Sequence, residues 1–382
     1  MSRTTLALCA HYFATFAALG VIFPFFPNWL SARRLSGLEL SAIVALRPVL
    51  GVVGPLVSGL VADRLALRGS MLRLVSVGAL AVMSGLAAIS AFGIELAFWP
   101  LFCLVFAYAV FRSPMLTLAD TVALEERASY GALRLWGSLG FMVAALTTGW
   151  FVDPEALAGL PIAVAVVLLV ALLAALPLPV RAEHMPRPVW QDARRLAAGR
   201  VYATFLAVAV IWAAAHGCYN VTISLYLRDL GASPRFIGLC WALATLTEVA
   251  LLAASGSLLR RVDARTLLVV GLLAGAVRWG LVSAIESLPV LLALQPLHAL
   301  SFALVWVSAM DFVKRHAPAH ILATGQGLFA AAMAGGSGIG ILGWGTLYAT
   351  LGGATVYRAA AVVALVGAMA AASLRSMRQP PS

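Results

Sequence analysis

Two charged side chains of opposite sign interrupt apolar sequence and are the first candidates for a functional site. Arg134 lies in the apolar run YGALRLWGSLGF, and Asp120 lies upstream in FRSPMLTLADTVAL. An arginine costs roughly 2.5–3.5 kcal/mol at the centre of a helix in a bilayer, so it requires an acidic partner, water or an anionic ligand. The short polar segment EERASYG between the two runs predicts an antiparallel helix pair, with both charges near the shared end.

A second group of polar residues lies in four apolar runs of the second half, at similar depths. The group consists of His216, Tyr219 and Asn220 in residues 201–227, Glu248 in 233–258, Arg278 in 265–285, and Gln295 and His298 in 288–312. Burial favours a neutral carboxyl group, whereas a nearby arginine favours a charged one. A change in the distance between Glu248 and Arg278 would therefore cause the carboxyl group to bind or release a proton, and a histidine such as His298, which ordinarily titrates near neutrality, can share this proton.

The composition indicates an all-α, polytopic membrane protein. Of the 382 residues, 62% are hydrophobic and 11% are charged, whereas about 25% are charged in an average soluble domain. At about 20 residues per spanning helix, the apolar runs predict twelve transmembrane helices. These runs lie near residues 5–30, 38–62, 71–93, 97–118, 131–151, 157–178, 201–227, 233–258, 265–285, 288–312, 321–350 and 353–374.

The formal charge of +11 follows the predicted loops and does not indicate a nucleic-acid partner. Of the 26 Lys and Arg residues, 17 fall on the side that has both termini, five on the other side and four inside helices. An excess of basic residues in the loops of one side marks that side as cytoplasmic. We therefore expect a monomer in the inner membrane, with both termini in the cytoplasm and with the lipid bilayer, protons and a small-molecule substrate as its partners.

Several catalytic and cofactor-binding motifs are missing from the sequence. The single lysine, Lys314, lies in DFVKRHAP, so no GxxxxGK[ST] nucleotide-binding loop exists. HExxH and GxSxG do not occur either, and no Cys/His spacing is typical of a zinc site. We expect no enzymatic activity, no cofactor and no metal.

The two halves of the chain repeat one pattern at an offset of 197 residues. Trp29 corresponds to Tyr226, Ser36 corresponds to Ser233, and the next residue pair is Gly59 and Gly256. The longest polar segment, rich in Arg and Pro, separates the copies. The pattern predicts a six-helix bundle at 1–180, a cytoplasmic linker at 181–200 and a second six-helix bundle at 201–382. Parallel six-helix repeats with a site at their interface near midplane are the architecture of major facilitator transporters.

The segment GLVADRLALRG after the second run resembles the loop signature of the major facilitator superfamily. In that superfamily the turn is a conformational latch, which implies that Gly59, Asp63 and Arg64 gate the transporter. The second copy, GSLLRRVDARTL, has Arg260 in place of Asp63. A short loop with an excess of positive charge is the alternative interpretation of either copy.

The motifs YGALRLWGSLGF, HGCYN, LTEV, VRWG and QPLHALSF, in this order, resemble the phenylpropionate permease family of the major facilitator superfamily. That family is similar to oligosaccharide and nucleoside proton symporters. The resemblance implies proton-linked import of a small organic solute. It also implies that Glu248, Arg278 and His298 take part in proton coupling, and that Asp120 and Arg134 form the charged pair tied to substrate.

We therefore expect a proton-coupled symporter for an aromatic or other small organic acid such as phenylpropionate. A guanidinium group presents a forked pair of donors to a carboxylate, so Arg134, with Arg112 or Arg278 nearby, is expected to hold the acid. Trp136 and Tyr219 are expected to contact its apolar body, and His216, Asn220 and Gln295 are further predicted substrate residues. Asp120 is also a candidate for proton coupling. Two alternatives stay open: a drug/proton antiporter on the same fold, and a membrane sensor that transports nothing. An intramembrane enzyme is a more distant third.

Overall fold

The computed structural model describes residues 3–64, 68–125, 130–151, 159–178, 190–318 and 321–374. These residues form helices and short turns, with no strand among them. The first half contains α1 (Arg3–Ser31), α2 (Gly37–Arg64), α3 (Arg68–Ala91), α4 (Phe98–Arg112), α5 (Met115–Glu125), α6 (Tyr130–Phe151) and α7 (Leu160–Ala175). The second half contains α8 (Trp190–Ala198), α9 (Arg200–Asp229), α10 (Pro234–Arg261), α11 (Ala264–Ala284), α12 (Leu288–Ala293), the π-helix η1 (Ala299–Leu304), α13 (Val305–His316) and α14 (Leu322–Ala372).

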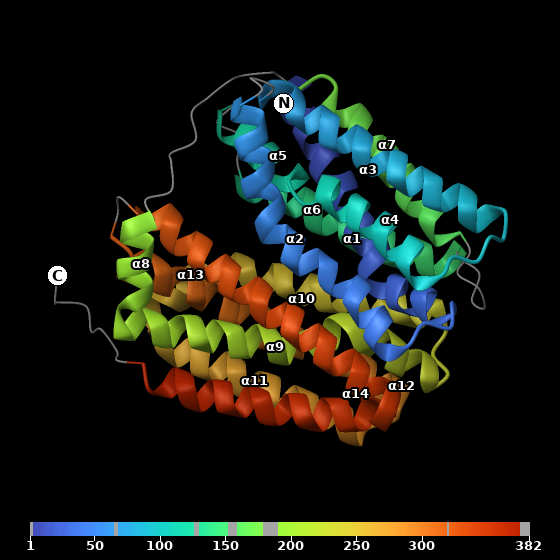
Figure 1. Ribbon diagram of the computed structural model, residues 1–382. Coiled ribbons are helices and arrows are strands. Elements are labelled where there is room, and N and C mark those ends of the chain that lie inside the picture. Colours follow the sequence, from blue (N-terminus) through green and yellow to red (C-terminus); the bar gives the residue numbers. More distant parts are fainter. Residues whose placement is uncertain are drawn as a thin grey trace. The chain divides into compact units, whose positions relative to one another are not determined.

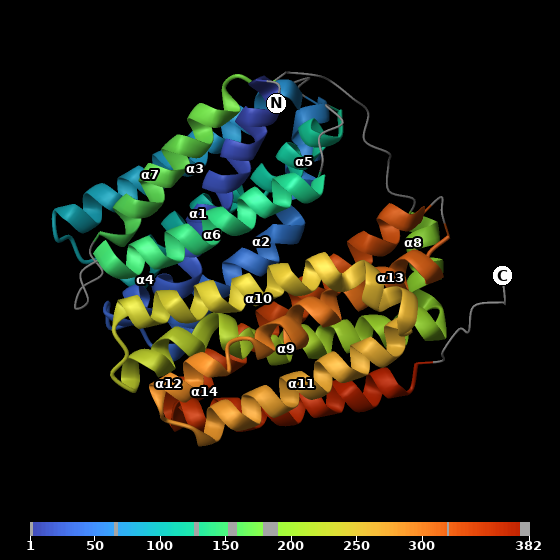
Figure 2. The ribbon, with the colours of Figure 1, turned by 180° about the vertical axis from the view of Figure 1, so that it is seen from behind.

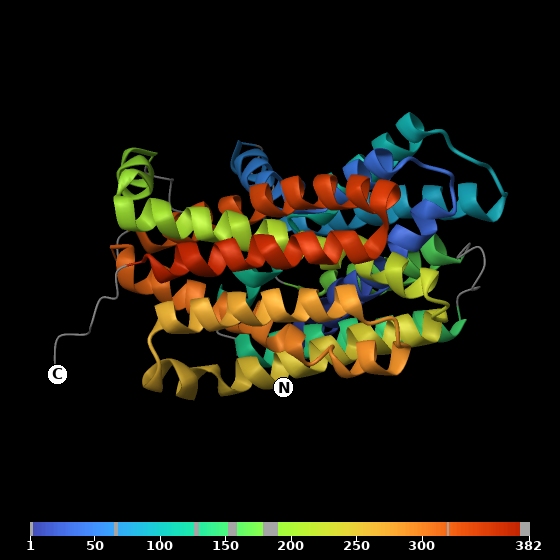
Figure 3. The same cartoon turned by 90° about the horizontal axis from the view of Figure 1, so that it is seen from below.

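The lengths of these helices are those of a membrane-spanning protein. Among the described residues, eight helices are long and apolar enough to cross a bilayer, and the apolar helices at 135–151 and 160–175 are shorter. The longest, α14, is interrupted at Gly352, which has φ 77° and ψ 173°. Figure 3 shows its two halves, coloured orange-red and red, as rods that run in opposite directions. The arrangement is consistent with the twelve predicted spans.

Two predicted runs are broken where proline or irregular backbone interrupts them. The run near 97–118 divides into α4 and α5, because Pro114 has no amide hydrogen with which to continue the helical ladder. The run near 288–312 divides into α12, η1 and α13. The predicted linker contains a short helix, α8, which the sequence analysis did not predict.

The chain forms two compact units. Unit 1 consists of Met1–Met185 and Val221–Leu246, and unit 2 consists of Pro186–Asn220 and Thr247–Ser382. Both α9 and α10 are therefore divided between the units: the second part of α9 and the first part of α10 belong to unit 1, and their other parts belong to unit 2. The division into bundles at 1–180 and 201–382 stays a prediction.

Unit 1 is built around α1, which packs against α6 and α7, while α3 packs against α4 and α7 (Figure 2). Glycines allow α1 and α6 to approach closely. A Cβ atom on Gly20 would lie 2.9 Å from Cα of Phe141, and one on Gly140 would lie 2.9 Å from Cα of Phe13. Small residues at such crossings let two membrane helices gain van der Waals contact along their backbones.

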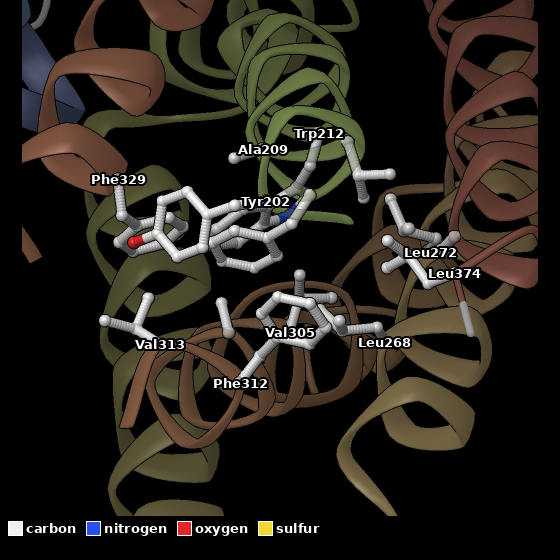
Figure 4. Packing of buried hydrophobic residues seen from close by; sticks show 14 of the residues in the cluster. Tyr202, Ala209, Trp212, Leu268, Leu272, Val305, Phe312, Val313, Phe329 and Leu374 are labelled. Atoms are coloured by element: carbon white, nitrogen blue, oxygen red, sulfur yellow. The ribbon is translucent and has the colours of Figure 1, made fainter. Parts of the chain in front are cut away.

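In unit 2, α11 packs along α14 (Figure 1) and against η1 and α13. A hydrophobic core of unit 2 lies between α9, α11, α13 and α14 and contains a group of aromatic rings (Figure 4). The ring of Phe205 stacks on Phe312 with centroids 4.4 Å apart and on Phe329 at 5.6 Å. Residues of this core lie on α9 and α11, the same helices that contain His216, Tyr219 and Arg278 of the polar site.

Candidate functional site

Unit 2 brings together side chains from four separate segments of the chain. Tyr219 and His216 come from α9, Glu248 from α10 and Arg278 from α11, while Gln295 and His298 come from the irregular segment between α12 and η1. The sequence analysis selected all six of them. The structure places these six side chains in one cluster, whereas their roles in transport stay predictions.

The irregular backbone of this segment has a local cause. Pro296 follows the last turn of α12 and has no amide hydrogen, so the regular ladder stops there and resumes in the wider π-helix η1. Non-helical backbone at membrane depth is tolerated where it is buried in protein or lines a water-filled cavity. Gln295 and His298 lie on either side of Pro296, so both project from this break.

Arg278 is the centre of the cluster and is only 1% exposed. Its Nη1 atom donates to Oγ of Ser301 at 3.2 Å and contacts Nδ1 of His298 at 3.1 Å, and its Nη2 atom donates to Oε1 of Gln295 at 3.1 Å. The guanidinium group also lies over the ring of Tyr219, 4.6 Å from its centroid. These bonds fix the direction of the guanidinium group and replace the water that burial removed.

Gln295 has its amide orientation fixed by the same contacts. Its Oε1 atom accepts from Arg278 and from the hydroxyl of Tyr219, which lies 3.2 Å away, so both lone pairs of the oxygen are used. Its Nε2 atom donates to the carbonyl of Leu291 at 2.9 Å. The amide therefore links α9 and α11 to the turn after α12.

The contact between Arg278 and His298 determines the tautomer of the imidazole. An arginine only donates hydrogen bonds, so Nδ1 of His298 is the acceptor and the proton of the neutral ring lies on Nε2. Nε2 in turn lies 3.6 Å from Oε2 of Glu248, just beyond hydrogen-bond range. Glu248, His298 and Arg278 thus form a continuous series in which the imidazole joins the carboxyl group to the guanidinium group.

Aromatic rings surround this series. The rings of His216 and His298 have centroids 5.4 Å apart, and Phe302 stacks on His298 at 5.3 Å. The sequence analysis missed Ser301, which bonds to Arg278, and Trp212, whose Nε1 atom donates to the Ser301 carbonyl at 3.0 Å. Ser301 is one helical turn from His298 and shares its face, and this spacing could have identified the serine as a site residue.

Two predicted substrate residues are not among the residues that make these contacts. Trp136 is 42% exposed on α6 of unit 1. Asn220 is half-buried at the end of the α9 part of unit 2, and no hydrogen bond to the Arg278 cluster is present among the described residues. Their predicted contact with a substrate stays a prediction.

In unit 1, α1 positions two predicted site residues. The hydroxyl of Tyr12 donates a hydrogen bond to the carboxylate of Asp120. Nη2 of Arg112 donates to the carbonyl of Thr15 at 2.9 Å. Tyr12 and Thr15 are three residues apart and share a face of the helix, so one face of α1 holds both groups. The sequence analysis missed Tyr12, because a tyrosine in an apolar helix is common.

Some predicted residues fall outside the described side chains. This applies to Arg134 and to the predicted latch residues Gly59, Asp63 and Arg64, so the pairing of Arg134 with Asp120 and the latch stay predictions. Within the described residues, no group of three or more His, Cys, Asp or Glu side chains is arranged to hold a metal ion.

The chain is similar in sequence to known transporters over most of its length. It is 29% identical over 364 residues to a probable 3-phenylpropionic acid transporter of Escherichia coli (strain K12), which covers 92% of this chain and 93% of the relative. It is 31% identical over 344 residues to a maltose permease of Geobacillus stearothermophilus, which covers 86% of this chain and 83% of the relative.

Solved structures share its fold. The nucleoside transporter NupG superposes with a TM-score of 0.82 at 17% identity, covering 98% of this chain and 99% of that one. An auto-inhibited peptide transporter of the POT family superposes with a TM-score of 0.76 at 14% identity, covering 100% and 99%. Residues 5–359 match the MFS_1 like family. The chain therefore belongs to the MFS_1 like family of the major facilitator superfamily, whose members here are multi-pass membrane transporters and not enzymes.

Proposed function

We propose that this protein is a proton-coupled symporter that imports a small organic acid, with an aromatic carboxylate such as phenylpropionate as the first candidate. The likeness to a probable 3-phenylpropionic acid transporter over 92% of the chain supports the substrate class. The described spans and the basic excess on one side support a location in the inner membrane with cytoplasmic termini, where we propose that the protein is a monomer. The two six-helix bundles would alternate access around the substrate, and Gly59, Asp63 and Arg64 would gate the cytoplasmic side.

The single observation that supports proton coupling is the series Glu248–His298–Arg278. The carboxyl group is 24% exposed at its side chain, whereas the imidazole is 9% exposed, so Glu248 is the more accessible of the two groups. Because Nδ1 of His298 accepts from Arg278, a second proton on this ring would face a guanidinium group. The proton that is carried therefore belongs on Glu248, and His298 and Arg278 sense whether it is there.

Protonation of Glu248 would cancel its attraction to the Arg278 side of the site. In the proposed cycle, Glu248 is protonated when substrate loads from outside, and its deprotonation accompanies release inside. One proton on Glu248 and one carboxylate together carry no net charge, so the pH gradient drives accumulation in this cycle. The membrane potential, at about 2.3 kcal/mol per charge for each 100 mV, would contribute only if a further proton entered with the substrate.

For the substrate, we propose that Arg134 holds the carboxylate with help from Arg112, and that Trp136, Tyr219, Asn220 and His216 contact the organic body. Asp120 would compensate the charge of the arginine group between substrates. A guanidinium group suits this role, since it donates two parallel hydrogen bonds to a carboxylate. Arg278 and Gln295 support the site through the bonds that they already make.

The test is uptake by purified protein in liposomes under an imposed proton gradient. Radiolabelled 3-phenylpropionate should accumulate in wild-type liposomes, and dissipating the gradient with a protonophore should abolish accumulation. Glu248→Gln should retain exchange of labelled for unlabelled substrate across the membrane but lose gradient-driven accumulation. If Glu248→Gln still accumulates substrate, the coupling role of Glu248 is wrong.

A second candidate substrate class is an oligosaccharide, favoured by the 31% identity to a maltose permease. The same liposomes, supplied with labelled maltose, distinguish the two classes. Efflux is a further outcome. In that case, cells that lack the protein would become sensitive to its substrates, whereas loss of an importer would slow growth on them.

A further inference from the structure

Unit 1 contains a group of buried polar atoms that have no hydrogen bond of good geometry to the described residues, although the side chains of Tyr108 and Arg112 within the group interact with each other. The four atoms are Nε2 of His11, Oγ1 of Thr15, the hydroxyl of Tyr108 and Nε of Arg112. Buried polar groups are nearly always bonded, so each exception calls for a ligand, an ion or water. None of the four atoms has a part in the hydrogen bonds described for the Asp120 region.

The four residues belong to one place in the fold. His11 and Thr15 are one turn apart on α1, and Tyr108 and Arg112 are one turn apart on α4, so each pair shares a face. Nη2 of Arg112 joins the two helices through the carbonyl of Thr15. Nδ1 of His11 points the other way, to the carbonyl of Ala171 at 2.9 Å, which leaves Nε2 on the opposite edge of the ring.

Arg47 adds a second positive charge to this group. It lies on α2 with its Cζ atom 3.4 Å from the ring centroid of Phe23. Two turns further along α2, Gly54 lies against α4, where a Cβ atom would be 2.8 Å from Cβ of Ser113. The face of α2 that includes Arg47 therefore packs against α4 beside Arg112. The guanidinium groups of Arg47 and Arg112 repel each other, and the neutral side chain of Tyr108 interacts with Arg112.

Neither arginine forms an ion pair with a carboxylate in the described part of the chain. Arg47 contacts an aromatic ring, and Arg112 contacts a backbone carbonyl. Two guanidinium groups that repel each other at membrane depth are costly unless an anion compensates them. Arg278 of unit 2 differs, because Ser301, His298 and Gln295 already occupy its terminal nitrogens.

We infer that Arg47 and Arg112, with the hydroxyl of Tyr108, form a binding site for the carboxylate of the transported acid. This inference rests on the proposed function and deepens it, because it adds Arg47 of α2 and Tyr108 of α4 to Arg134 and Arg112, to which the proposed function assigns the carboxylate. Nε of Arg112 and the hydroxyl of Tyr108 would donate hydrogen bonds to the carboxylate from α4, and the hydroxyl of Thr15 would donate from α1. Arg47 would add a positive charge from α2. The site selects an organic monoanion over a neutral molecule of the same shape.

The test compares binding of 3-phenylpropionate and its neutral analogue 3-phenylpropanamide to purified protein, with labelled ligand and with thermal unfolding. Wild-type protein should bind the acid and be stabilised by it, and it should bind the amide at least tenfold more weakly, since a hydrogen bond to a charged group contributes more than a neutral one. Arg47→Gln and Arg112→Gln should each weaken binding of the acid by at least tenfold. Arg47→Lys, which keeps the charge, should lie between wild type and Arg47→Gln.

The unfolding temperature without ligand separates a binding role from a structural one. Removing an uncompensated charge should leave this temperature unchanged or raise it, whereas removing a structural arginine would lower it. Arg33→Gln is the matched control, because Arg33 also stacks on an aromatic ring of unit 1, Trp29, at 3.3 Å but lies outside this group. It should bind the acid as tightly as wild type.

Several outcomes would overturn the inference. Unchanged affinity of both glutamine variants for the acid would mean that only water satisfies these atoms, and lowered unfolding temperatures would mean a structural role. Accumulation of maltose under a proton gradient without binding of any carboxylate would overturn the anion site and leave proton-coupled transport standing. Binding of 3-phenylpropionate that depends on the two arginines, without gradient-driven accumulation, would support the anion site and overturn proton-coupled transport.

Discussion

Oε2 of Glu248 and Nε2 of His298 lie 3.6 Å apart, and the carboxyl group is linked to Arg278 through this imidazole. His298 therefore has two separable tasks: its Nδ1 atom accepts from Arg278, and its Nε2 atom faces Glu248. Because the amide oxygen of Asn can take the place of Nδ1 but has no counterpart of Nε2, His298→Asn separates these tasks, whereas His298→Leu removes both.

His298→Asn should keep an acceptor for Arg278 and lose the group that faces Glu248. We expect it to unfold near the wild-type temperature, to exchange substrate and to lose gradient-driven accumulation. His298→Leu should also be less stable, by about 1–3 kcal/mol, because a buried donor of Arg278 loses its acceptor. Accumulation by His298→Asn at the wild-type level would contradict the role of the imidazole in coupling.

The aromatic core of unit 2 gives a prediction about stability that is independent of transport. Phe205 is 1% exposed and stacks on both Phe312 and Phe329. Phe205→Ala should destabilise the protein by an amount near the low end of the about 3–5 kcal/mol typical of buried Phe→Ala changes in soluble cores. The low end is expected because the unfolded helices stay in detergent, so mainly packing is lost and little burial from water.

The measurement for Phe205→Ala is unfolding in detergent by titration with a denaturing surfactant, followed by tryptophan fluorescence. Phe92→Ala is the control, since that ring is 82% exposed at the turn after α3. It should shift the midpoint by no more than about 0.5 kcal/mol, as is usual for surface changes. Equal effects of the two variants would show that the core of Figure 4 does not dominate the stability of unit 2.

Most of the spans could be predicted from the sequence, because an apolar run of about 20 residues is typical of a membrane-spanning helix. The family could be predicted from short motifs such as YGALRLWGSLGF and QPLHALSF. The breaks were harder. The polar site at Gln295 and His298 lies where the run near 288–312 divides, and composition alone does not locate a π-helix. Gly352, which has a positive φ angle, interrupts α14. This residue falls between the two runs predicted near 321–350 and 353–374, so the sequence did place this break.

The charged residues of the candidate site could be predicted from the sequence, whereas its hydroxyl-bearing residues could not. Glu248, Arg278 and His298 stood out because ionisable groups in apolar helices are rare. Ser301, Tyr12 and Tyr108 did not stand out, because hydroxyl groups are inexpensive in a helix. Their contacts also depend on helix rotation, and apolar periodicity does not fix rotation when both the lipid-facing and the core-facing sides are hydrophobic.

Asp263 provides a prediction about pH at a loop outside the membrane spans. It is the N-cap of α11, and it accepts from the amide of Thr266 at 2.9 Å and from its hydroxyl at 2.7 Å. Burial raises the pKa of Asp263, but these hydrogen bonds and the nearby Arg265 outweigh burial, so the pKa lies below its usual value. The carboxylate thus stabilises the folded state fully above the pKa of the unfolded chain and loses this effect as the pH falls through the lower, folded-state pKa.

Asp263→Ala should therefore cost about 0.5–2 kcal/mol near neutral pH, the usual value of an N-cap. The difference between wild type and Asp263→Ala should shrink as the pH falls below about 4, where the aspartate protonates even in the unfolded chain. Asp263→Asn keeps an acceptor without a titrating charge, so its stability relative to Asp263→Ala should not change over this range. A difference between wild type and Asp263→Ala that is independent of pH would show that the charge is not what stabilises this cap.

The last prediction concerns two glycines of unit 1 that let α6 and α10 touch. A Cβ atom on Gly149 of α6 would lie 2.5 Å from the carbonyl oxygen of Pro234, and one on Gly238 of α10 would meet the carbonyl of Ala145. The two contacts are one turn apart on each helix, so the backbones meet along a short seam. Beside it, the ring of Trp241 lies 5.8 Å from Phe23.

Gly238→Ala should separate these helix ends, since the neighbouring group is backbone and does not rotate away. We expect the change to favour the state in which the end of unit 1 near residues 23 and 241 is open. A cysteine at position 23, made as Phe23→Cys, should then react faster with a membrane-impermeant maleimide added to intact cells. Gly51→Ala is the matched control, because a Cβ atom there meets nothing within 4 Å. Equal labelling rates in the two backgrounds would mean that the glycine seam does not hold this end closed.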